Sequence, residues 1–408
     1  MLESVKLEDA QSMLTDLVNP LPGEHVPLLR ACGRVASRDV FADYDLPSIP
    51  QAAVDGYALP SGEAGGDNRN YVVKEHLRPG EMPGFPLEQG SVTRVITGGP
   101  VPDGTGAVIP YEATRFVKDN VTFMKRISPG SNLKLPGEDF CSGDLLVRSG
   151  SLLTPGLIGV LAAYGRKKVD VFRRPRVAVL SLGQEIVPYH TKPFPGQVRD
   201  SNGPLLSALV QRAGGLVTGV DIAAAGDSPR SNSRLLESFL EQSDLVLTVG
   251  GAASGFFDRA LYIIRQAGAR LLFRGIKIKP GSHSGGAVSN GKLIISLSGN
   301  PAACAVGYHL LVAPVLRIMQ GLNAYIPVFP AVCAGFFKKN GGKRRFLQGV
   351  AAYGREGGWT VKILPGQKSS MLRSLIDANA LVELPPGRRP LVEGDEVKML
   401  LLNALGDV

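Results

Sequence analysis

Hydrophobic and polar positions follow two different periods along the chain, and the first segment shows the helical one. Leu7, Ala10, Leu14 and Leu17 fall on one face of a predicted helix, which Asn19-Pro20 should end. From there to about residue 150, short β-type runs alternate with Gly/Pro turns and predict a β-rich module. These runs are Tyr71–Val73, Val92–Ile96, Ala107–Ile109 and Asn120–Phe123.

A second helix is predicted from Thr154-Pro155 through Tyr164. Thr is a good N-cap, Pro suits the first helical position, and Gly165 fits the C-terminal cap. We expect this helix to pack with the first one, around the β insertion.

Beyond Pro175 strands and helices alternate, which predicts a mostly parallel sheet covered by helices on both faces. The predicted strands are Val177–Ser181, Leu216–Asp221, Leu245–Val249 and Leu293–Leu297. The predicted helices are Pro204–Ala213, Ser231–Glu241, Arg259–Ala267 and Pro301–Met319. After Tyr325 the β pattern returns, in the runs Arg345–Val350, Trp359–Ile363, Ala380–Leu384 and Val397–Leu402.

The sequence therefore predicts a multidomain α/β plus β protein. Residues 1–53 and 137–174 should form an N-terminal α+β linker domain, with a β-rich domain, residues 54–136, inserted into it. Residues 175–323 should form a central three-layer α/β domain, and residues 324–408 a small β-barrel-like domain. A chain of 408 residues is long enough for several such cores.

Composition and charge limit the kinds of partner and the cellular location that we expect for this chain. The net charge is +9, but the basic clusters lack interleaved aromatic residues, so we expect no nucleic acid partner. No apolar run reaches the length needed to cross a bilayer, and the N-terminus carries acids rather than an apolar core, so neither a membrane span nor a signal peptide is expected. The four scattered cysteines favour no zinc site or disulfide framework, which indicates the cytoplasm.

Three Gly-rich motifs follow predicted strands, where open parallel sheets bind ligands. Each alone is explained by a tight βα connection, but three at one edge predict a shared pocket for a phosphate-bearing ligand. The motifs are Ser181-Leu-Gly-Gln-Glu185, Thr248-Val-Gly-Gly-Ala-Ala-Ser-Gly255 with Asp258, and Ser298-Gly-Asn-Pro301.

Other polar positions admit two interpretations. Lys277 and Lys279 share a face of an extended segment and could reach one anion, or they could belong to a solvated edge strand. Asp200-Ser201-Asn202 precedes a helix and could simply cap it, and Asp227 follows Gly226 where Asp commonly makes a turn.

Taken together, the motifs resemble the molybdopterin molybdenumtransferase family, of the MoeA and gephyrin E-domain type, almost from end to end. The N-terminal markers are Asp55-Gly-Tyr-Ala, Thr97-Gly-Gly-Pro-Val-Pro and Gly137-Glu-Asp139. The later markers are Pro175-Arg-Val-Ala-Val, Gly183-x-Glu185, Asp200-Ser-Asn202, Gly250-Gly251 with Gly255 and Asp258, Lys279-Pro-Gly281, Gly299-Asn-Pro301 and Gln367-x-Ser-Ser370.

The resemblance implies an elongated four-domain protomer that forms a homodimer. The active cleft would lie between the α/β domain of one subunit and the β-rich module of the other. It implies that adenylylated molybdopterin and molybdate react with Mg²⁺ to give molybdenum cofactor and AMP. A molybdopterin adenylyltransferase and molybdoenzymes are the possible protein partners.

The resemblance also implies the site residues. The catalytic candidates are Asp55, Asp139, Glu185, Asp227 and Asp258, of which Glu185, Asp227 and Asp258 would hold the metal. The substrate-binding candidates are Thr97, Ser181, Gly183, Asp200, Ser201, Asn202, Gly250, Gly251, Ser254, Lys277, Lys279, Ser298, Gly299, Asn300 and Pro301.

The chain departs from the family pattern in the same loops. Gln184 stands where Asp is usual, Ala253 and Ala303 stand where Ser is usual, and Ser282-His283 replaces Lys-Pro. Two hydroxyls and one cation are thus missing near the expected oxyanion, and each lost charge-assisted hydrogen bond costs about 1.5–3 kcal/mol. A tungstate-selective paralogue and a non-catalytic cofactor-binding or scaffold protein therefore remain alternatives.

Overall fold

The computed structural model describes residues 2–66, 69–223, 229–251, 259–338, 342–355 and 357–402. The chain divides into two compact units, each described by itself. The first contains Met1–Arg38, Ser149–Gly159 and Arg166–Val408, and the second contains Asp39–Arg148 and Val160–Gly165. The four-domain boundaries expected from the sequence remain a prediction.

A seven-stranded mixed sheet forms the centre of the first unit. All neighbouring strands are parallel except those on either side of β21, which is antiparallel to both. The mostly parallel sheet predicted for residues 175–323 is thereby confirmed. The strand order is β1 (Leu2–Val5), β19 (Arg270–Ile276), β21 (Gly285–Ser289), β22 (Lys292–Leu297), β18 (Leu245–Gly250), β14 (Arg176–Leu182) and β17 (Leu216–Ala223).

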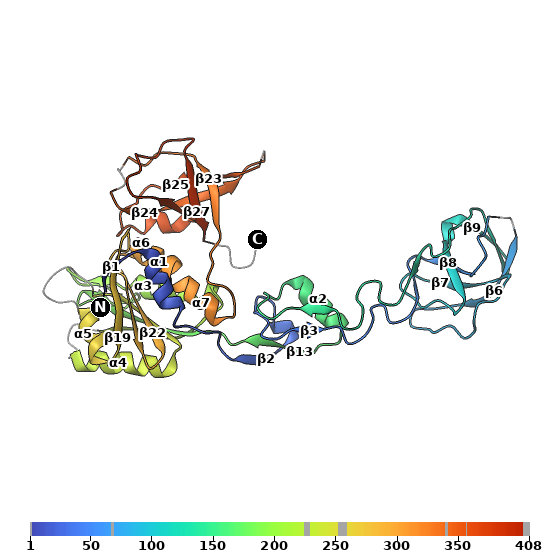
Figure 1. Cartoon of the computed structure of the whole chain (residues 1–408), viewed down its shortest axis with the longest axis horizontal. Coiled ribbons are helices and arrows are strands. Elements are labelled where there is room, and N and C mark those ends of the chain that lie inside the picture. Colours follow the sequence, from blue (N-terminus) through green and yellow to red (C-terminus); the bar gives the residue numbers. More distant parts are fainter. Residues whose placement is uncertain are drawn as a thin grey trace. The chain divides into compact units, whose positions relative to one another are not determined.

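Helices cover both faces of this sheet, as the three-layer prediction requires (Figure 1). The sheet has a hydrophobic core on each face, and alternate residues of β14 contribute to the two cores. Val177 and Val179 belong to the first core, and Ala178 and Leu180 belong to the second. The first core is completed by α1 (Leu7–Thr15), α3 (Asn202–Arg212), α6 (Pro301–Gly307), the π-helical turn Tyr308–Val312 and α7 (Ala313–Met319). The second is completed by α4 (Pro229–Gln242) and α5 (Arg259–Gln266).

The continuous helix Pro301–Met319 corrects one expectation. It is long and apolar enough to cross a membrane, the one such helix among the described residues, although no apolar run of that length was expected. His309 and Arg317 lie within this helix, so its sequence contains no uninterrupted apolar run of that length. Because 78% of its apolar window is buried inside the protein, it serves as a core helix of the α/β domain.

The N-terminal segment also differs from its prediction. β1 extends the sheet by pairing in parallel with β19, and neither strand was predicted. Helix α1 ends at Thr15, so Leu17 lies beyond it and is 39% exposed. The apolar face of α1 packs on β19 and α7 of the α/β core.

That second helix, α2 (Pro155–Ala163), has the predicted ends. The Leu157 N–H donates to Thr154 Oγ1 at 3.4 Å, which satisfies a free N–H of the first turn. Gly165 follows with a φ of 67°, the left-handed conformation that commonly ends a helix. Just beyond it, β13 (Lys168–Phe172) pairs with β2 (Gly23–Pro27) in an antiparallel ribbon.

The C-terminal strands form a closed five-stranded barrel, which confirms the barrel-like prediction. Closure comes from β24, which pairs with β25 on one side and with β26 on the other. The order is β24 (Arg344–Tyr353), β25 (Trp359–Ile363), β23 (Val328–Cys333), β27 (Glu396–Leu401) and β26 (Ala380–Leu384). A short strand, β20 (Ile278–Lys279), pairs with the start of β24, and α8 (Arg373–Asp377) precedes β26.

The second unit contains a six-stranded sheet, and the β-rich character predicted for this half is confirmed. Gly56 is required at its centre, because an added Cβ would lie 2.0 Å from the Ile109 carbonyl oxygen. The order is β8 (Thr105–Pro110), β5 (Gly56–Pro60), β7 (Ser91–Val95), β6 (Asn70–His76), β10 (Asn120–Phe123) and β9 (Thr114–Val117). Two small ribbons pair β4 (Gln51–Ala52) with β11 (Leu133–Lys134), and β3 (Val40–Phe41) with β12 (Leu145–Val147).

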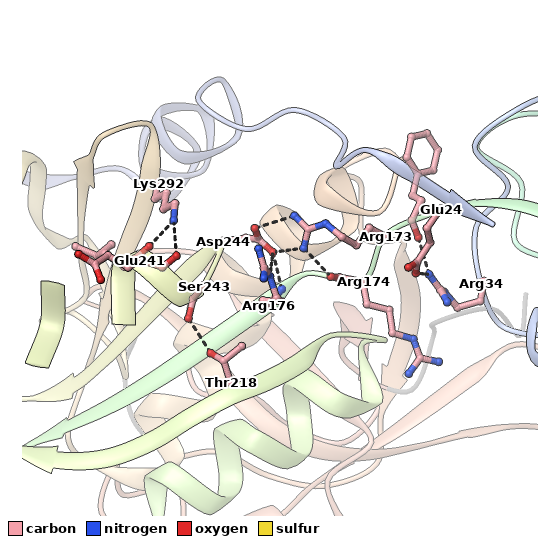
Figure 2. A network of polar contacts seen from close by, with 12 residues as sticks. Glu24, Arg34, Arg173, Arg174, Arg176, Thr218, Glu241, Ser243, Asp244 and Lys292 are labelled. Carbon is pink, nitrogen blue, oxygen red and sulfur yellow. Dashed lines mark hydrogen bonds and ion pairs between the residues drawn. The ribbon is translucent and has the colours of Figure 1, made fainter. Parts of the chain in front are cut away.

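A polar network fixes the start of β14 (Figure 2). Arg173 Nη1 and Nη2 donate to the two carboxylate oxygens of Asp244 at 2.8 and 2.9 Å, and the Arg176 N–H donates to Asp244 Oδ2 at 2.7 Å. Burial raises the pKa of Asp244, but these hydrogen bonds outweigh burial, so the pKa lies below its ordinary value. The bidentate ion pair between Arg173 and Asp244 thus fixes the first residues of β14.

We expect Asp244→Asn to lower the free energy of unfolding at pH 7 by about 2 kcal/mol, because hydrogen bonds to a charged group contribute about 1.5–3 kcal/mol. The pKa is lowered by folding, so the contribution is present above the unfolded-state pKa and is lost as pH falls through the folded-state pKa. Urea unfolding followed by fluorescence of Trp359, the single tryptophan, measures both effects.

Asp221→Asn is the matched control, because Asp221 is exposed in β17 and, among the described residues, its Oδ1 accepts only the N–H of Ile222. Its stability should stay within about 0.5 kcal/mol of wild type at both pH values. An equal loss in the two variants, or a loss in Asp244→Asn that persists in acid, would contradict the prediction.

Candidate functional site

A cleft of about 580 Å³ opens at the carboxyl ends of β14, β18 and β22. Open α/β sheets bind their ligands at this edge, as the three Gly-rich motifs predicted. Two short strands, β15 (Ile186–Val187) and β16 (Val198–Arg199), pair beside it. The lining residues are Leu182, Glu185, Ile186, Val198, Arg199, Asp200, Ser201, Asn202, Gly250, Gly251, His283, Ser298, Gly299, Asn300 and Pro301.

Asp200 is the most extensively hydrogen-bonded side chain of the cleft. Its Oδ2 accepts from Ser181 Oγ at 2.9 Å, and its Oδ1 accepts the N–H groups of Asn202 and Gly203 at 3.1 and 3.0 Å. It is only 5% exposed. Asp200 therefore caps α3, as one interpretation of the motif predicted, and ties this helix to the end of β14. Asp200 lines the cleft, whereas Ser181 is 1% exposed and supports it from behind without lining it.

Asn202 connects α3 to the third Gly-rich turn. Its Nδ2 donates to the Gly299 carbonyl oxygen at 2.7 Å. Its Oδ1 is buried and accepts no hydrogen bond in the described part of the chain. A buried acceptor without a partner is uncommon, and substrate-binding sites are one place where it occurs.

The third turn is also held from the barrel side. Asn300 Nδ2 donates to Ser369 Oγ at 3.2 Å, and the Ala302 N–H donates to the Ser369 carbonyl oxygen at 3.0 Å. Asn300 occupies the N-cap position of α6 without a capping hydrogen bond from its side chain. Ser369 belongs to the family marker Gln367-x-Ser-Ser370, but its role at this turn was not predicted.

Ala303 corrects an expectation. This position is 1% exposed, within the buried face of α6, and it does not line the cleft. A serine hydroxyl at this position would therefore lie in the buried face of α6 and would not line the described cleft.

The glycines let backbone segments approach one another at the cleft. Gly250 and Gly251 have φ values of 83° and 69°, and an added Cβ on Gly250 would lie 2.6 Å from the Leu182 carbonyl oxygen. Gly299 lies against the same turn, because its added Cβ would be 3.1 Å from Gly250 Cα. Gly183 shapes the turn before Glu185 but does not itself line the cleft.

Of the charged or basic side chains that line the cleft, Glu185 and Asp200 were predicted, whereas Arg199 and His283 were not. Glu185 is exposed in it and its carboxylate makes no hydrogen bond to the described residues. Arg199 and His283 also line it, although sequence reasoning gave neither a role. Lys277 and Lys279 are exposed but do not line it. The predicted Asp227, Asp258 and Ser254, together with Ala253, lie outside the described residues.

Three predicted residues belong to the second unit. The N–H and Oγ1 of Thr97 donate to Asp55 Oδ1 at 2.7 and 2.8 Å. The backbone hydrogen bond and then the hydroxyl lower the pKa of Asp55 below its ordinary value, which favours the carboxylate. Asp139 lines a separate hollow of about 450 Å³, together with Leu46, Pro47, Ser48, Gln51, Lys134 and Glu138.

A divalent metal has limited ligands in the described cleft. No group of three or more His, Cys, Asp or Glu side chains that could hold a metal occurs among residues 2–66, 69–223, 229–251, 259–338, 342–355 and 357–402. Asp200 already accepts three hydrogen bonds, whereas the Glu185 carboxylate is available. One carboxylate fits Mg²⁺, which is commonly bound by one or two carboxylates, waters and substrate phosphates.

Family models match the chain in three consecutive parts. These are the MoeA N-terminal region (domain I and II) at residues 5–165, a probable molybdopterin binding domain at residues 178–318, and the MoeA C-terminal region (domain IV) at residues 330–402.

Relatives match over nearly the whole length. The molybdopterin molybdenumtransferase of Staphylococcus aureus (strain MRSA252) is 31% identical over 97% of this chain and 95% of its own. That of Staphylococcus epidermidis (strain ATCC 12228) is 31% identical over 92% and 90%. A molybdopterin biosynthesis MoeA protein from Pyrococcus horikoshii has a similar structure, with a TM-score of 0.82, 31% identity, and coverage of 98% and 99%.

The Gly250 turn provides a test of the cleft geometry. We expect Gly250→Ala to lower the free energy of unfolding by more than about 2 kcal/mol, because the new Cβ has both an unfavourable φ and a backbone clash. Gly268→Ala is the control: its φ is 70°, but an added Cβ meets nothing within 4 Å. It should cost only about 1–2 kcal/mol. Urea unfolding of both variants measures the difference, and equal losses would refute the close approach.

Proposed function

Because the chain belongs to the MoeA family of molybdopterin molybdenumtransferases, we propose that its cleft binds adenylylated molybdopterin and molybdate. The enzyme is a transferase of molybdenum cofactor biosynthesis that inserts molybdenum into molybdopterin. The proposed reaction releases AMP. The cleft at the strand ends, bordered by the N-termini of α3 and α6, is the observation that carries the substrate assignment.

The residues of the cleft suit an anionic substrate. Backbone N–H groups at the two helix starts and the Gly250-Gly251 turn can approach phosphate oxygens closely. Glu185 would hold Mg²⁺ together with the substrate phosphates, and the metal would neutralise charge on the phosphoanhydride. Asp200 and Asn202 keep the two helix starts in place around the substrate. Asp227 and Asp258 remain proposed metal ligands.

We further propose a homodimer in the cytoplasm. The predicted Asp55, Thr97 and Asp139 belong to the second unit, and the family resemblance implies that two subunits contribute residues to one active site. A molybdopterin adenylyltransferase and molybdoenzymes are the proposed protein partners. The relatives carry the transferase name, and no observation favours the tungstate-selective or scaffold alternative.

Purified protein with adenylylated molybdopterin, molybdate and Mg²⁺ should release AMP and form active cofactor. Glu185→Gln should lower kcat about a hundredfold or more, because loss of the carboxylate weakens metal binding at the phosphates. Glu237→Gln, an exposed change on α4, should leave the rate unchanged. Chromatographic measurement of AMP tests the proposal, and no AMP release by the wild-type protein would refute it.

Subunit complementation tests the dimer. Glu185→Gln and Asp55→Asn proteins should each be nearly inactive alone. Refolded together in equal amounts, they should recover about one quarter of wild-type activity, because half of the dimers are mixed and each mixed dimer has one intact site. No recovery, despite a mixed dimer in native mass spectrometry, would show that each subunit builds its site alone.

A further inference from the structure

We propose that Arg199 binds a tetrahedral oxyanion of the substrate in the cleft, with His283 as a second donor to the same anion. This inference rests on the proposed function, because it assigns residues to the anionic substrate of that site. Both side chains line the cleft and both are exposed to it. They come from separate segments, since Arg199 ends β16 and His283 follows the Pro280-Gly281 turn after β20.

The neighbouring carboxylates leave Arg199 available for an anion. Asp200 follows it directly, but both Asp200 oxygens accept hydrogen bonds from Ser181, Asn202 and Gly203. Glu185 lines the same cleft without forming an ion pair to Arg199 in the described structure. An uncompensated guanidinium in a concave site attracts an oxyanion.

One hydrogen bond orients the guanidinium. Arg199 Nε donates to the Thr191 carbonyl oxygen at 2.9 Å, which fixes the base of the planar group. The two terminal nitrogens make no hydrogen bond to the described residues and can bind two oxygens of one anion side by side. A lysine would provide the charge without this paired geometry.

The lysines predicted from the sequence, Lys277 and Lys279, do not line the described cleft, and their role at the site stays a prediction. Lys279 lies in β20, which pairs with barrel strand β24. Among the described lining residues, Arg199 and His283 are the ones with nitrogen donors on basic side chains.

The test measures equilibrium binding of two anions by calorimetry, in wild-type protein and in Arg199→Gln, Arg199→Lys and His283→Gln. AMP represents the phosphate of the substrate, and molybdate represents the metal oxyanion. Arg199→Gln should weaken at least one of them about ten- to a hundredfold, as expected for a lost charge-assisted contact. Arg199→Lys should show a smaller loss, and His283→Gln should weaken the same anion about two- to tenfold.

Arg270→Gln removes the same charge from an exposed position of β19 outside the cleft and should bind both anions like wild type. The anion that Arg199→Gln weakens identifies whether phosphate or molybdate is bound there. The inference is overturned if Arg199→Gln binds both anions like wild type, if Arg270→Gln weakens binding equally, or if wild-type protein binds neither. AMP release by the wild-type enzyme tests the proposed function separately, because it does not depend on which cation binds the anion.

Discussion

The buried carboxylate of Asp200 is the contact on which the cleft depends. It joins the end of β14 to the start of α3, and Asn202 extends the connection to Gly299 at the end of β22. The packing allows no side chain at Gly203, because an added Cβ would lie 2.4 Å from Asp200 Oδ2. A charge capped by a helix N-terminus thus fixes three separate segments in one arrangement.

The charges of the cleft follow from this arrangement. Because both oxygens of Asp200 already accept hydrogen bonds from the protein, they do not compete with ligands for the guanidinium of Arg199. Glu185 keeps an available carboxylate nearby. The cleft therefore presents an available carboxylate and two basic side chains, Arg199 and His283, to a ligand.

Much of the fold was predictable because its strong signals are local. The strands β14, β18 and β22 are mostly apolar runs, and α2 carries its own capping residues. β1 and β19 were missed because their pairing joins residues from opposite ends of the domain. A four-residue strand such as β1 has no period long enough to identify it.

The location of the cleft was predictable from the sequence, whereas the two basic residues that line it were not predicted. Glycine turns after strands mark the cleft from the sequence alone, whereas the prediction for Lys277 and Lys279 rests only on their shared face of an extended segment. The pairing of β20 with the barrel determines where that segment runs, and such a long-range contact leaves no local pattern. Arg199 was adjacent to a recognised motif, but its hydrogen bond to Thr191 appears only in three dimensions.

Through the contacts of Ser369, the barrel supports one of the turns that line the cleft. This residue binds Asn300 and Ala302, and β20 joins β24 just before the turn that carries His283. Two of the loops around the ligand are therefore braced by a module that belongs to a different fold class. The barrel contributes no lining residue to the cleft in the described chain, yet it supports two of the loops that do. Exchange of the barrel between homologues would therefore alter the shape of the cleft.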